Sequence, residues 1–193
     1  MIYIIRHGQS IVNLDHQILG RKLDGDLTTL GHNQAYQAGR WLKDKNIKQI
    51  RTSPFKRTSQ TAQIIGNVLK LNPIPDHDLR SLDCGNLETN QNLDEWYTII
   101  HRWRRGEWNL AFPNGETLRQ AYDRFLRALS AVQYDAVVVS HGNIIESVLP
   151  LLCVNAAALQ RVKKPAHTGF VILEPYDTNR FICVAWNMLE HLK

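Results

Sequence analysis

Short uninterrupted apolar runs alternate along this chain with longer segments whose apolar positions have helical spacing. The apolar runs are rich in β-branched residues and predict strands at residues 1–6, 47–51, 136–140, near 168–173 and at 180–187. The helical spacing predicts helices at residues 30–45, 54–70, 93–105, 115–133 and 143–152, with a loop-rich segment at 71–92. Strands and helices that alternate in this way favour an α/β sheet.

Two of the predicted helices carry start signals. Thr28 and Thr29 are both suitable N-caps for the helix at 30–45, because a hydroxyl can accept a bond from a free backbone N–H. Ser53 precedes Pro54, and this pair predicts an N-cap followed by proline at the first helical position.

Polar clusters follow the predicted strands directly. Arg6-His7-Gly8 ends the first apolar run, and His141-Gly142-Asn143 ends the run at 136–140. The turn at 53–57, which contains Arg57, follows another strand. Ligands of an open α/β sheet collect at the carboxyl ends of its strands, and helix N-termini there favour anions. We therefore expect two imidazoles and two guanidiniums at one edge of the sheet.

These residue types suit a phosphoryl group. Arginine presents a planar fork to phosphate oxygens and keeps its charge, which stabilises a transition state whose charge is spread over the equatorial oxygens. An unprotonated imidazole can attack phosphorus in line and form a phosphohistidine. Such a scheme needs no metal, and no Cys or His cluster has the spacing of a zinc site.

Composition narrows the function classes further. The 193 residues, 44% hydrophobic and 21% charged, predict one globular domain, 1–193, without an apolar run of membrane-spanning length. A net charge of +5 fits either nucleic acid or an anionic small substrate. Apart from a dense patch at residues 102–105, the basic residues are dispersed and accompany no nucleic-acid-binding motif, so we expect the small substrate.

Two further features predict a cytoplasmic location. The N-terminus has neither a basic leader nor a small-residue cleavage site, so no signal peptide is expected. Cys84, Cys153 and Cys183 are few and far apart, which predicts reduced thiols and no disulfide framework.

The ordered set of motifs resembles the histidine phosphatase superfamily, the phosphoglycerate mutase-like proteins, in its phosphatase branch. Arg6-His7-Gly8 is similar to the family's Arg-His-Gly signature, and Ser140-His141-Gly142 to its second-histidine motif. Between them stand matches in the family's order: Asn13, Leu27-Thr28 with Gly31, Gln34 and Ala35, Ser53-Pro54 with Arg57-Thr58 and Gln60-Thr61-Ala62, and Gly115-Glu116-Thr117.

The resemblance implies a three-layer α/β/α sandwich with a mostly parallel central sheet and a small cap from residues 82–112. It implies a phosphomonoester hydrolase with His7 as nucleophile, while Arg6, Arg57 and His141 hold the phosphoryl group. The residues expected to support substrate binding are Gly8, Asn13, Gly142, Asn143, Glu116 and, in the cap, Arg104. Mutases of this family need a longer cap to retain their intermediate, and this chain is short, so we expect a phosphatase. A phosphoglycerate mutase-type transferase is the alternative.

One position departs from the family. The usual proton donor is a glutamate, whereas this chain has Ser81, and serine is a poor acid. Asp83 is our preferred replacement because, in an extended segment, it shares a face with position 81, and Glu88 and Glu116 are the other candidates. The departure also leaves open a catalytically weak module that binds a phosphorylated ligand.

The remaining histidines lack motif support and are expected at the surface or in packing: His16, His32, His77, His101, His167 and His191. The expected partner is a small phosphorylated substrate, with no cofactor, no metal, no nucleic acid and no membrane. A homodimer stays open as an alternative to a monomer.

Overall fold

A mixed sheet forms the centre of the molecule in a computed structural model that describes residues 1–14, 20–89, 93–159 and 163–193. Its six described strands have the order β3-β2-β4-β1-β5-β6. The bounds are β1 Ile2–Arg6, β2 Gln49–Thr52, β3 Pro73–Pro75, β4 Ala136–Ser140, β5 Phe170–Asp177 and β6 Arg180–Met188. The pairs from β3 to β1 are parallel, whereas β5 and β6 are antiparallel to their neighbours. The sheet is therefore mostly parallel, as the resemblance implied.

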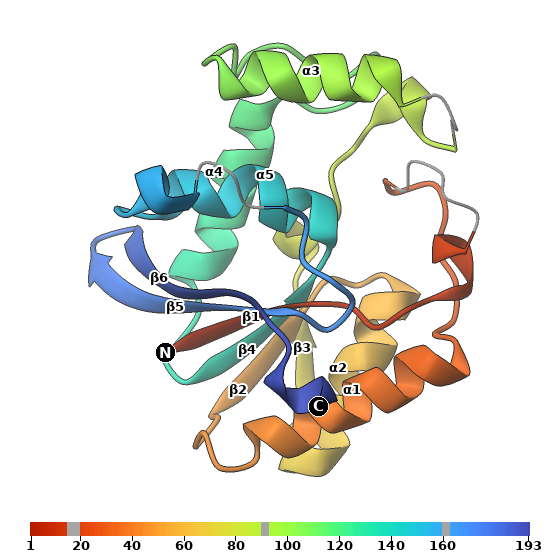
Figure 1. The fold of residues 1–193 in the computed structure, drawn as a ribbon, viewed down its shortest axis with the longest axis vertical. Coiled ribbons are helices and arrows are strands. Elements are labelled where there is room, and N and C mark those ends of the chain that lie inside the picture. The colour runs from red at the N-terminus through yellow and green to blue at the C-terminus, as the bar shows by residue number, and fades with distance from the viewer. Residues whose placement is uncertain (15–19, 90–92, 160–162) are drawn as a thin grey trace.

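Helices cover both faces of this sheet (Figure 1). The α-helices are α1 Thr29–Leu42, α2 Lys56–Leu69, α3 Asp94–Arg104, α4 Leu118–Ser130 and α5 Gly142–Leu152. Short 3-10 turns occupy Ile11–Asn13, His77–Leu79, Gly85–Leu87, Ala156–Leu159 and Glu190–Leu192. Helices α1 and α2 lie on one face and α4 and α5 on the other, while α3 lies beyond α4 and α5, away from the sheet.

Alternation along β1 creates a separate apolar core on each face. Ile2 and Ile4 belong to the cluster that includes α4, α5 and the buried side of α3, whereas Tyr3 and Ile5 pack with α1 and α2. Successive side chains of a strand point to opposite faces, so an apolar run without alternation requires a helical layer on both sides. This requirement explains why the runs at β1 and β4 are continuous.

Two local expectations at strand and helix ends are wrong. Residues 73–75 lie in the segment predicted as loop but form β3, an edge strand parallel to β2, because proline is tolerated where a strand has only one neighbour. Helix α2 begins at Lys56 with Phe55 as N-cap, so Ser53 is not the cap. By contrast, Thr28 caps α1 as predicted, and its hydroxyl accepts a 3.0 Å bond from the Gly31 N–H.

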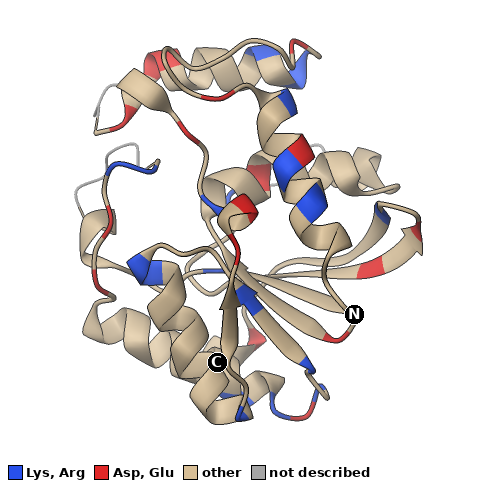
Figure 2. Cartoon of the chain, turned by 180° about the vertical axis from the view of Figure 1, so that it is seen from behind, with Lys and Arg blue, Asp and Glu red and all other residues tan. Residues whose placement is uncertain are grey.

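Charged side chains of both signs are spread over the described chain (Figure 2), and its cysteines are free. Basic and acidic positions are interspersed over the described chain, most visibly along α4 (Figure 2). Cys84, Cys153 and Cys183 are buried free thiols, as predicted. Among the described residues, no helix combines the length and apolar character needed to cross a membrane.

Candidate active site

The polar ends of three strands converge at the carboxyl edge of the sheet. Arg6 pairs in register with Ser140, and the backbone N–H of His7 continues the ladder by donating to the Ser140 carbonyl at 3.0 Å. Ser53 extends β2 in the same way by donating to the Val139 carbonyl at 3.0 Å. As a result, the ring centroids of His7 and His141 are 5.4 Å apart. The predicted meeting of two imidazoles is therefore present.

His7 has one ring nitrogen fixed by the backbone and one without a hydrogen-bond partner in the described part of the chain. Its Nδ1 lies 2.7 Å from the Gly8 carbonyl oxygen, and a carbonyl can only accept, so Nδ1 carries the proton. The lone pair is then on Nε2, which has no hydrogen-bond partner among the described residues. Burial, followed by the charges of Arg6 and Arg57, lowers the pKa of His7 well below its ordinary value. The ring is a neutral imidazole with an available nucleophilic nitrogen.

Arg57 is a buried guanidinium held by the loop that precedes α1. Its Nη1 donates to the Leu23 carbonyl at 2.9 Å and to Asp24 Oδ1 at 3.0 Å, and its Nη2 donates to the Gly20 carbonyl. Its side chain is only 1% exposed. Thr61, one helical turn later, accepts the Gly8 N–H at 3.0 Å and so ties this part of α2 to the His7 loop.

Arg6 is anchored from the opposite side, by the segment before β5. Its Nη1 donates to the Pro165 carbonyl at 2.8 Å, and its Nη2 lies 3.2 Å from His167 Nε2. Burial, with a smaller contribution from Arg57, lowers the pKa of Arg6 to about 10, so it stays charged at neutral pH. Both ends of the guanidinium are thus occupied by protein groups.

His141 is the fourth side chain of the cluster that contains His7, Arg6 and Arg57. Its Nε2 lies 2.8 Å from Ser53 Oγ, and burial lowers the pKa of this imidazole well below its ordinary value. Of the buried nitrogens that have no hydrogen-bond partner within the described part of the chain, three belong to this cluster: Arg6 Nε, Arg57 Nε and His141 Nδ1. Buried polar groups are normally satisfied, so two open guanidinium N–H donors and an open imidazole nitrogen beside His7 indicate a place for an anion.

Two residues in this region were missed from the sequence. His167 was expected at the surface or in packing, but its ring centroid lies 5.5 Å from that of His7. The sequence carries no signal for this position, because it depends on β5 pairing antiparallel with β1 and so beginning at the edge where β1 ends. Ser53, taken from the sequence as a helix cap, instead contacts His141.

Four of the residues proposed for substrate binding lie near the histidines in the sequence or in the segment after β1, and their contacts are mostly structural: Gly8, Asn13, Gly142 and Asn143. A Cβ on Gly8 would lie 2.6 Å from the Gly31 carbonyl oxygen, and one on Gly142 would lie 2.5 Å from Lys164 Cγ. Asn13 Oδ1 accepts from the backbone N–H and hydroxyl of Ser10, while Asn143 Oδ1 accepts from Lys164 at 3.3 Å. The two glycines therefore allow close packing around the site.

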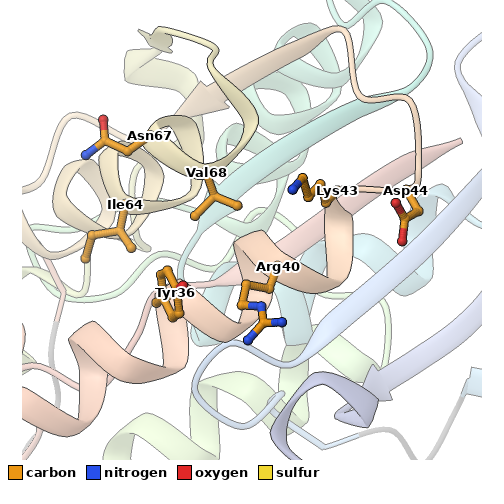
Figure 3. Close-up of a pocket in the computed structure, with 7 residues that line it drawn as sticks. All are labelled: Tyr36, Arg40, Lys43, Asp44, Ile64, Asn67 and Val68. Carbon is orange, nitrogen blue, oxygen red and sulfur yellow. The ribbon is translucent and has the colours of Figure 1, made fainter.

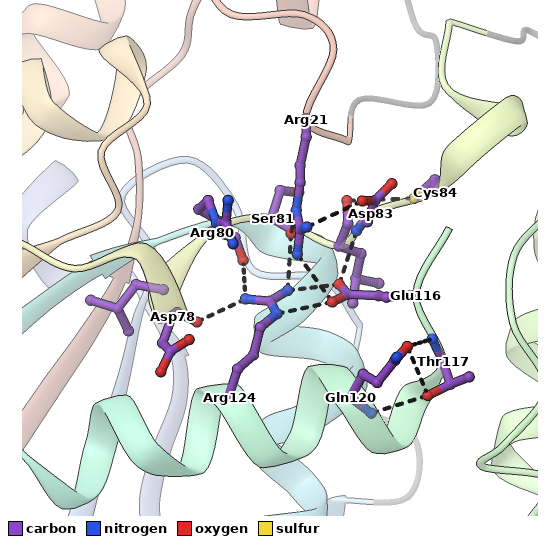
Figure 4. Close-up of polar contacts among 12 residues, drawn as sticks. Arg21, Asp78, Arg80, Ser81, Asp83, Cys84, Glu116, Thr117, Gln120 and Arg124 are labelled. Atoms are coloured by element: carbon purple, nitrogen blue, oxygen red, sulfur yellow. Dashed lines mark hydrogen bonds and ion pairs between the residues drawn. The ribbon is translucent and has the colours of Figure 1, made fainter. Parts of the chain in front are cut away.

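Two of the three candidate acids, Asp83 and Glu116, lie in a polar network around Arg21 and Arg124 (Figure 4). Asp83 pairs with Arg21 at 3.2 Å and accepts from the Gly85 N–H at 3.1 Å. Glu116 pairs with Arg21 at 3.0 Å and with Arg124 at 2.7 Å. Each carboxylate therefore has donors of its own, and Arg21, which no sequence motif had singled out, joins two of them.

The third candidate, Glu88, is buried beside the Arg57 loop. It accepts from the backbone N–H groups of Arg21, Lys22 and Cys84. A Cβ on Gly20 would lie 2.0 Å from its Oε1, so this glycine lets the carboxylate approach the loop. Glu88 thereby fastens the loop that holds Arg57.

Arg104 of the predicted cap segment does not contact the histidines. It pairs with Glu146 of α5 at 3.4 Å and is 54% exposed. Arg102, on the same helix, pairs with Glu107. Both arginines are therefore paired with carboxylates of the protein itself.

A separate pocket of about 590 Å³ lies between α1 and α2 (Figure 3). Its lining consists of Tyr36, Arg40, Lys43, Asp44, Ile64, Asn67 and Val68, so none of the proposed site residues contributes to it. Within the described residues, no group of three or more His, Cys, Asp or Glu side chains is arranged to hold a metal ion.

Comparison with known proteins agrees with the motifs. The model of the "Histidine phosphatase superfamily (branch 1)" matches residues 2–189. A "Probable phosphoglycerate mutase" of Erwinia tasmaniensis is 33% identical over 150 residues, which cover 73% of this chain and 69% of the relative.

Two solved structures show the same fold. A mycobacterial glucosyl-3-phosphoglycerate phosphatase in complex with VO3 has a TM-score of 0.79 at 21% identity, covering 96% of this chain and 98% of that one. A phosphoglycerate mutase from Bacillus anthracis also has a TM-score of 0.79, at 19% identity, covering 99% and 94%. At these identities the likeness establishes the phosphoglycerate mutase-like fold, while the reaction stays open.

Proposed function

Because the chain belongs to the histidine phosphatase superfamily, whose members are phosphoryl-transfer enzymes, we propose that it hydrolyses a small phosphomonoester through a phosphohistidine on His7. The observation that carries the proposal is a set of three buried nitrogens, Arg6 Nε, Arg57 Nε and His141 Nδ1, that have no partner among the described residues and surround an imidazole whose Nε2 also has none there. A phosphoryl group supplies the acceptors that these donors lack, and its phosphorus can face the nucleophile.

The reaction has two displacements at phosphorus. In the first, the Nε2 lone pair forms the N–P bond as the P–O bond to the leaving group breaks, and that oxygen takes up a proton. In the second, water attacks phosphorus, the N–P bond breaks, and inorganic phosphate leaves with His7 neutral again. Arg6 and Arg57 offset the negative charge in both steps, so we propose that no metal is needed.

Asp83 is our proposed proton donor for the leaving group. A donor must exchange its proton with water, and the Asp83 side chain is 36% exposed compared with 9% for Glu116. Glu88 is buried against three backbone donors and lies beside the Arg57 loop. Of the three carboxylates, Asp83 therefore best combines access to solvent with the position expected from the sequence.

Hydrolysis is favoured over mutase-type transfer by the ion pairs of two basic residues of the cap. A mutase must retain a doubly phosphorylated intermediate, which requires cations beyond those that hold one phosphoryl group. Arg102 and Arg104 are already paired with Glu107 and Glu146. The printed name of the Erwinia relative keeps transfer as the second candidate.

Turnover and trapping test the proposal directly. We expect hydrolysis of p-nitrophenyl phosphate that survives chelation by EDTA and is inhibited by vanadate, whose adduct with imidazole mimics the transition state. Acid-labile, base-stable labelled enzyme should form in the wild type and be absent in His7→Ala. Label that persists in His7→Ala but disappears in His141→Ala would reverse the roles of the two histidines. Interconversion of phosphoglycerates faster than phosphate release would favour the mutase.

The proton donor is tested with two leaving groups, because an alkoxide needs protonation and p-nitrophenolate does not. Asp83→Asn should lower kcat on an alkyl phosphate by about 10²–10⁴-fold and affect the aryl phosphate much less. Glu116→Gln is the matched carboxylate control. Equal losses on both substrates in Asp83→Asn would place Asp83 in folding or binding, and a selective loss in Glu116→Gln or Glu88→Gln would transfer the role.

A further inference from the structure

We propose that His167 is a positioning residue that orients the Arg6 guanidinium toward the phosphoryl group by accepting its hydrogen bond on an uncharged ring. The inference rests on the proposed function, because it assigns a role within the same phosphoryl site. His167 belongs to the chain segment before β5 and lies beside the end of β1, where its ring contacts both Arg6 and the His7 backbone.

The two contacts of the ring determine its tautomer. His167 Nδ1 lies 3.2 Å from the His7 carbonyl oxygen, and His167 Nε2 lies 3.2 Å from Arg6 Nη2. A carbonyl oxygen can only accept and a guanidinium can only donate. His167 therefore donates from Nδ1 and accepts at Nε2, which is the neutral form with one proton.

Its surroundings keep the ring neutral. Burial, followed by the charge of Arg6 and more weakly that of Lys164, lowers the pKa of His167 to about 4. A proton on Nε2 would face the Arg6 N–H and remove the only acceptor that the ring offers to it. At neutral pH the contact is therefore a hydrogen bond from a cation to an uncharged acceptor.

The comparison with Arg57 shows what an uncharged acceptor achieves. Arg57 is held by the carboxylate of Asp24, which offsets part of its charge. Arg6 is held by the Pro165 carbonyl and by His167, both uncharged, and Glu146, which raises its pKa more weakly than burial lowers it, makes no hydrogen bond to it among the described residues. With Nη1 and Nη2 both fixed, the guanidinium cannot rotate, and its buried Nε has no other partner among the described residues.

The side-chain geometry allows the two contacts of His167 to be removed separately. Asparagine places an amide near the Nδ1 position and can keep the bond to the His7 carbonyl, but it is too short to reach Arg6. Glutamine places its amide near the Nε2 position and can still accept from Arg6. The pair His167→Asn and His167→Gln therefore distinguishes a role through Arg6 from a role through the backbone.

The experiment measures binding of inorganic phosphate by calorimetry and hydrolysis of p-nitrophenyl phosphate in His167→Ala, His167→Asn and His167→Gln. A hydrogen bond to a charged group predicts a loss of about 10- to 100-fold in phosphate affinity and in kcat/KM for Ala and Asn. Gln should stay within about 5-fold of the wild type. His32→Ala, which removes an exposed histidine of α1, is the control and should match the wild type in both assays.

The thermal midpoint of each variant is measured, so that a folding defect is recognised. If His167→Ala folds poorly, the comparison rests on His167→Asn and His167→Gln. Affinity in His167→Ala within about 2-fold of the wild type would overturn the inference, as would retention by Asn with loss in Gln. A wild type that binds phosphate but hydrolyses no phosphomonoester would contradict the proposed function alone, because the affinities still decide the role of His167. A wild type that binds no phosphate would overturn both.

Discussion

Replacing Arg124 with methionine should destabilise the protein strongly, although Arg124 does not contact His7. This residue, 6% exposed, uses all five of its N–H donors. Two bonds reach Glu116 and three reach the carbonyls of Asp78, Arg80 and Ser81 (Figure 4). Methionine keeps much of the apolar stem but leaves the Glu116 carboxylate with fewer donors and three carbonyls without their partner.

The magnitude follows from the loss of one partner of a buried ion pair, which typically costs about 3–5 kcal/mol. We therefore expect Arg124→Met to lower the free energy of unfolding by about 4 kcal/mol. For a chain of 193 residues this corresponds to a decrease in Tm of roughly 8–16 °C. Urea unfolding followed by tryptophan fluorescence measures the first quantity, and differential scanning calorimetry measures the second.

A matched control lies one turn further along α4. Arg127 pairs with Asp78 at 3.1 Å but is 64% exposed, so Arg127→Met should cost less than about 1 kcal/mol. If the two variants lose the same small amount, the inference that the buried network holds residues 78–83 in place is wrong. If only Arg124→Met is destabilised, its remaining folded fraction should also have lower kcat, because Ser81 and Asp83 lie on the released segment.

Three further predictions address other parts of the site and its support. Ser53→Ala should lower kcat/KM for p-nitrophenyl phosphate by about 10-fold. When the Ser53 hydroxyl donates to His141 Nε2, the ring proton is on Nδ1 and can be donated to substrate, and the variant removes this hydroxyl. An unchanged kcat/KM would contradict this role. Gly8→Ala should fold poorly, since its Cβ would lie 2.6 Å from the Gly31 carbonyl oxygen, and a circular dichroism melt equal to that of the wild type would refute the close approach. Burial lowers the pKa of His191 to about 4, so the unfolded chain takes up this proton first as the pH falls below about 6.5, and the free energy of unfolding decreases between about pH 6.5 and 4. His191→Gln should weaken that pH dependence in urea unfolding at pH 7 and pH 5, and an identical slope would argue against a buried neutral ring.

The parts of the site that the sequence predicts are those encoded within a few residues. An apolar run followed at once by Arg6 and His7 reports both a buried strand and a polar end, and the same holds for the run before His141. Since parallel strands end at one edge, the meeting of these residues follows from local pattern and general topology. The confirmed Thr28 cap is local in the same sense.

The parts that the sequence does not predict depend on partners far along the chain. Ser53 has the local pattern of a helix cap, but its hydroxyl faces His141, 88 residues away. His167 contacts Arg6 across 161 residues, and Arg124 reaches the carbonyls of residues 78–81. No periodicity specifies such pairs, because each depends on how two elements pack. The Pro73–Pro75 strand was missed for a similar reason, since only its neighbour β2 makes it a strand.

The different anchoring of the two arginines connects the fold to the proposed chemistry. A buried guanidinium needs acceptors, yet every carboxylate that satisfies it also competes with a substrate anion. Arg57 is satisfied by two carbonyls and one carboxylate, whereas Arg6 is satisfied by a carbonyl and an uncharged imidazole. Because β5 enters the sheet antiparallel to β1, the Pro165 carbonyl and His167 reach Arg6 from the segment before that strand. The antiparallel edge of an otherwise parallel sheet thus supplies uncharged acceptors that let one arginine be buried without a carboxylate hydrogen-bonded to it.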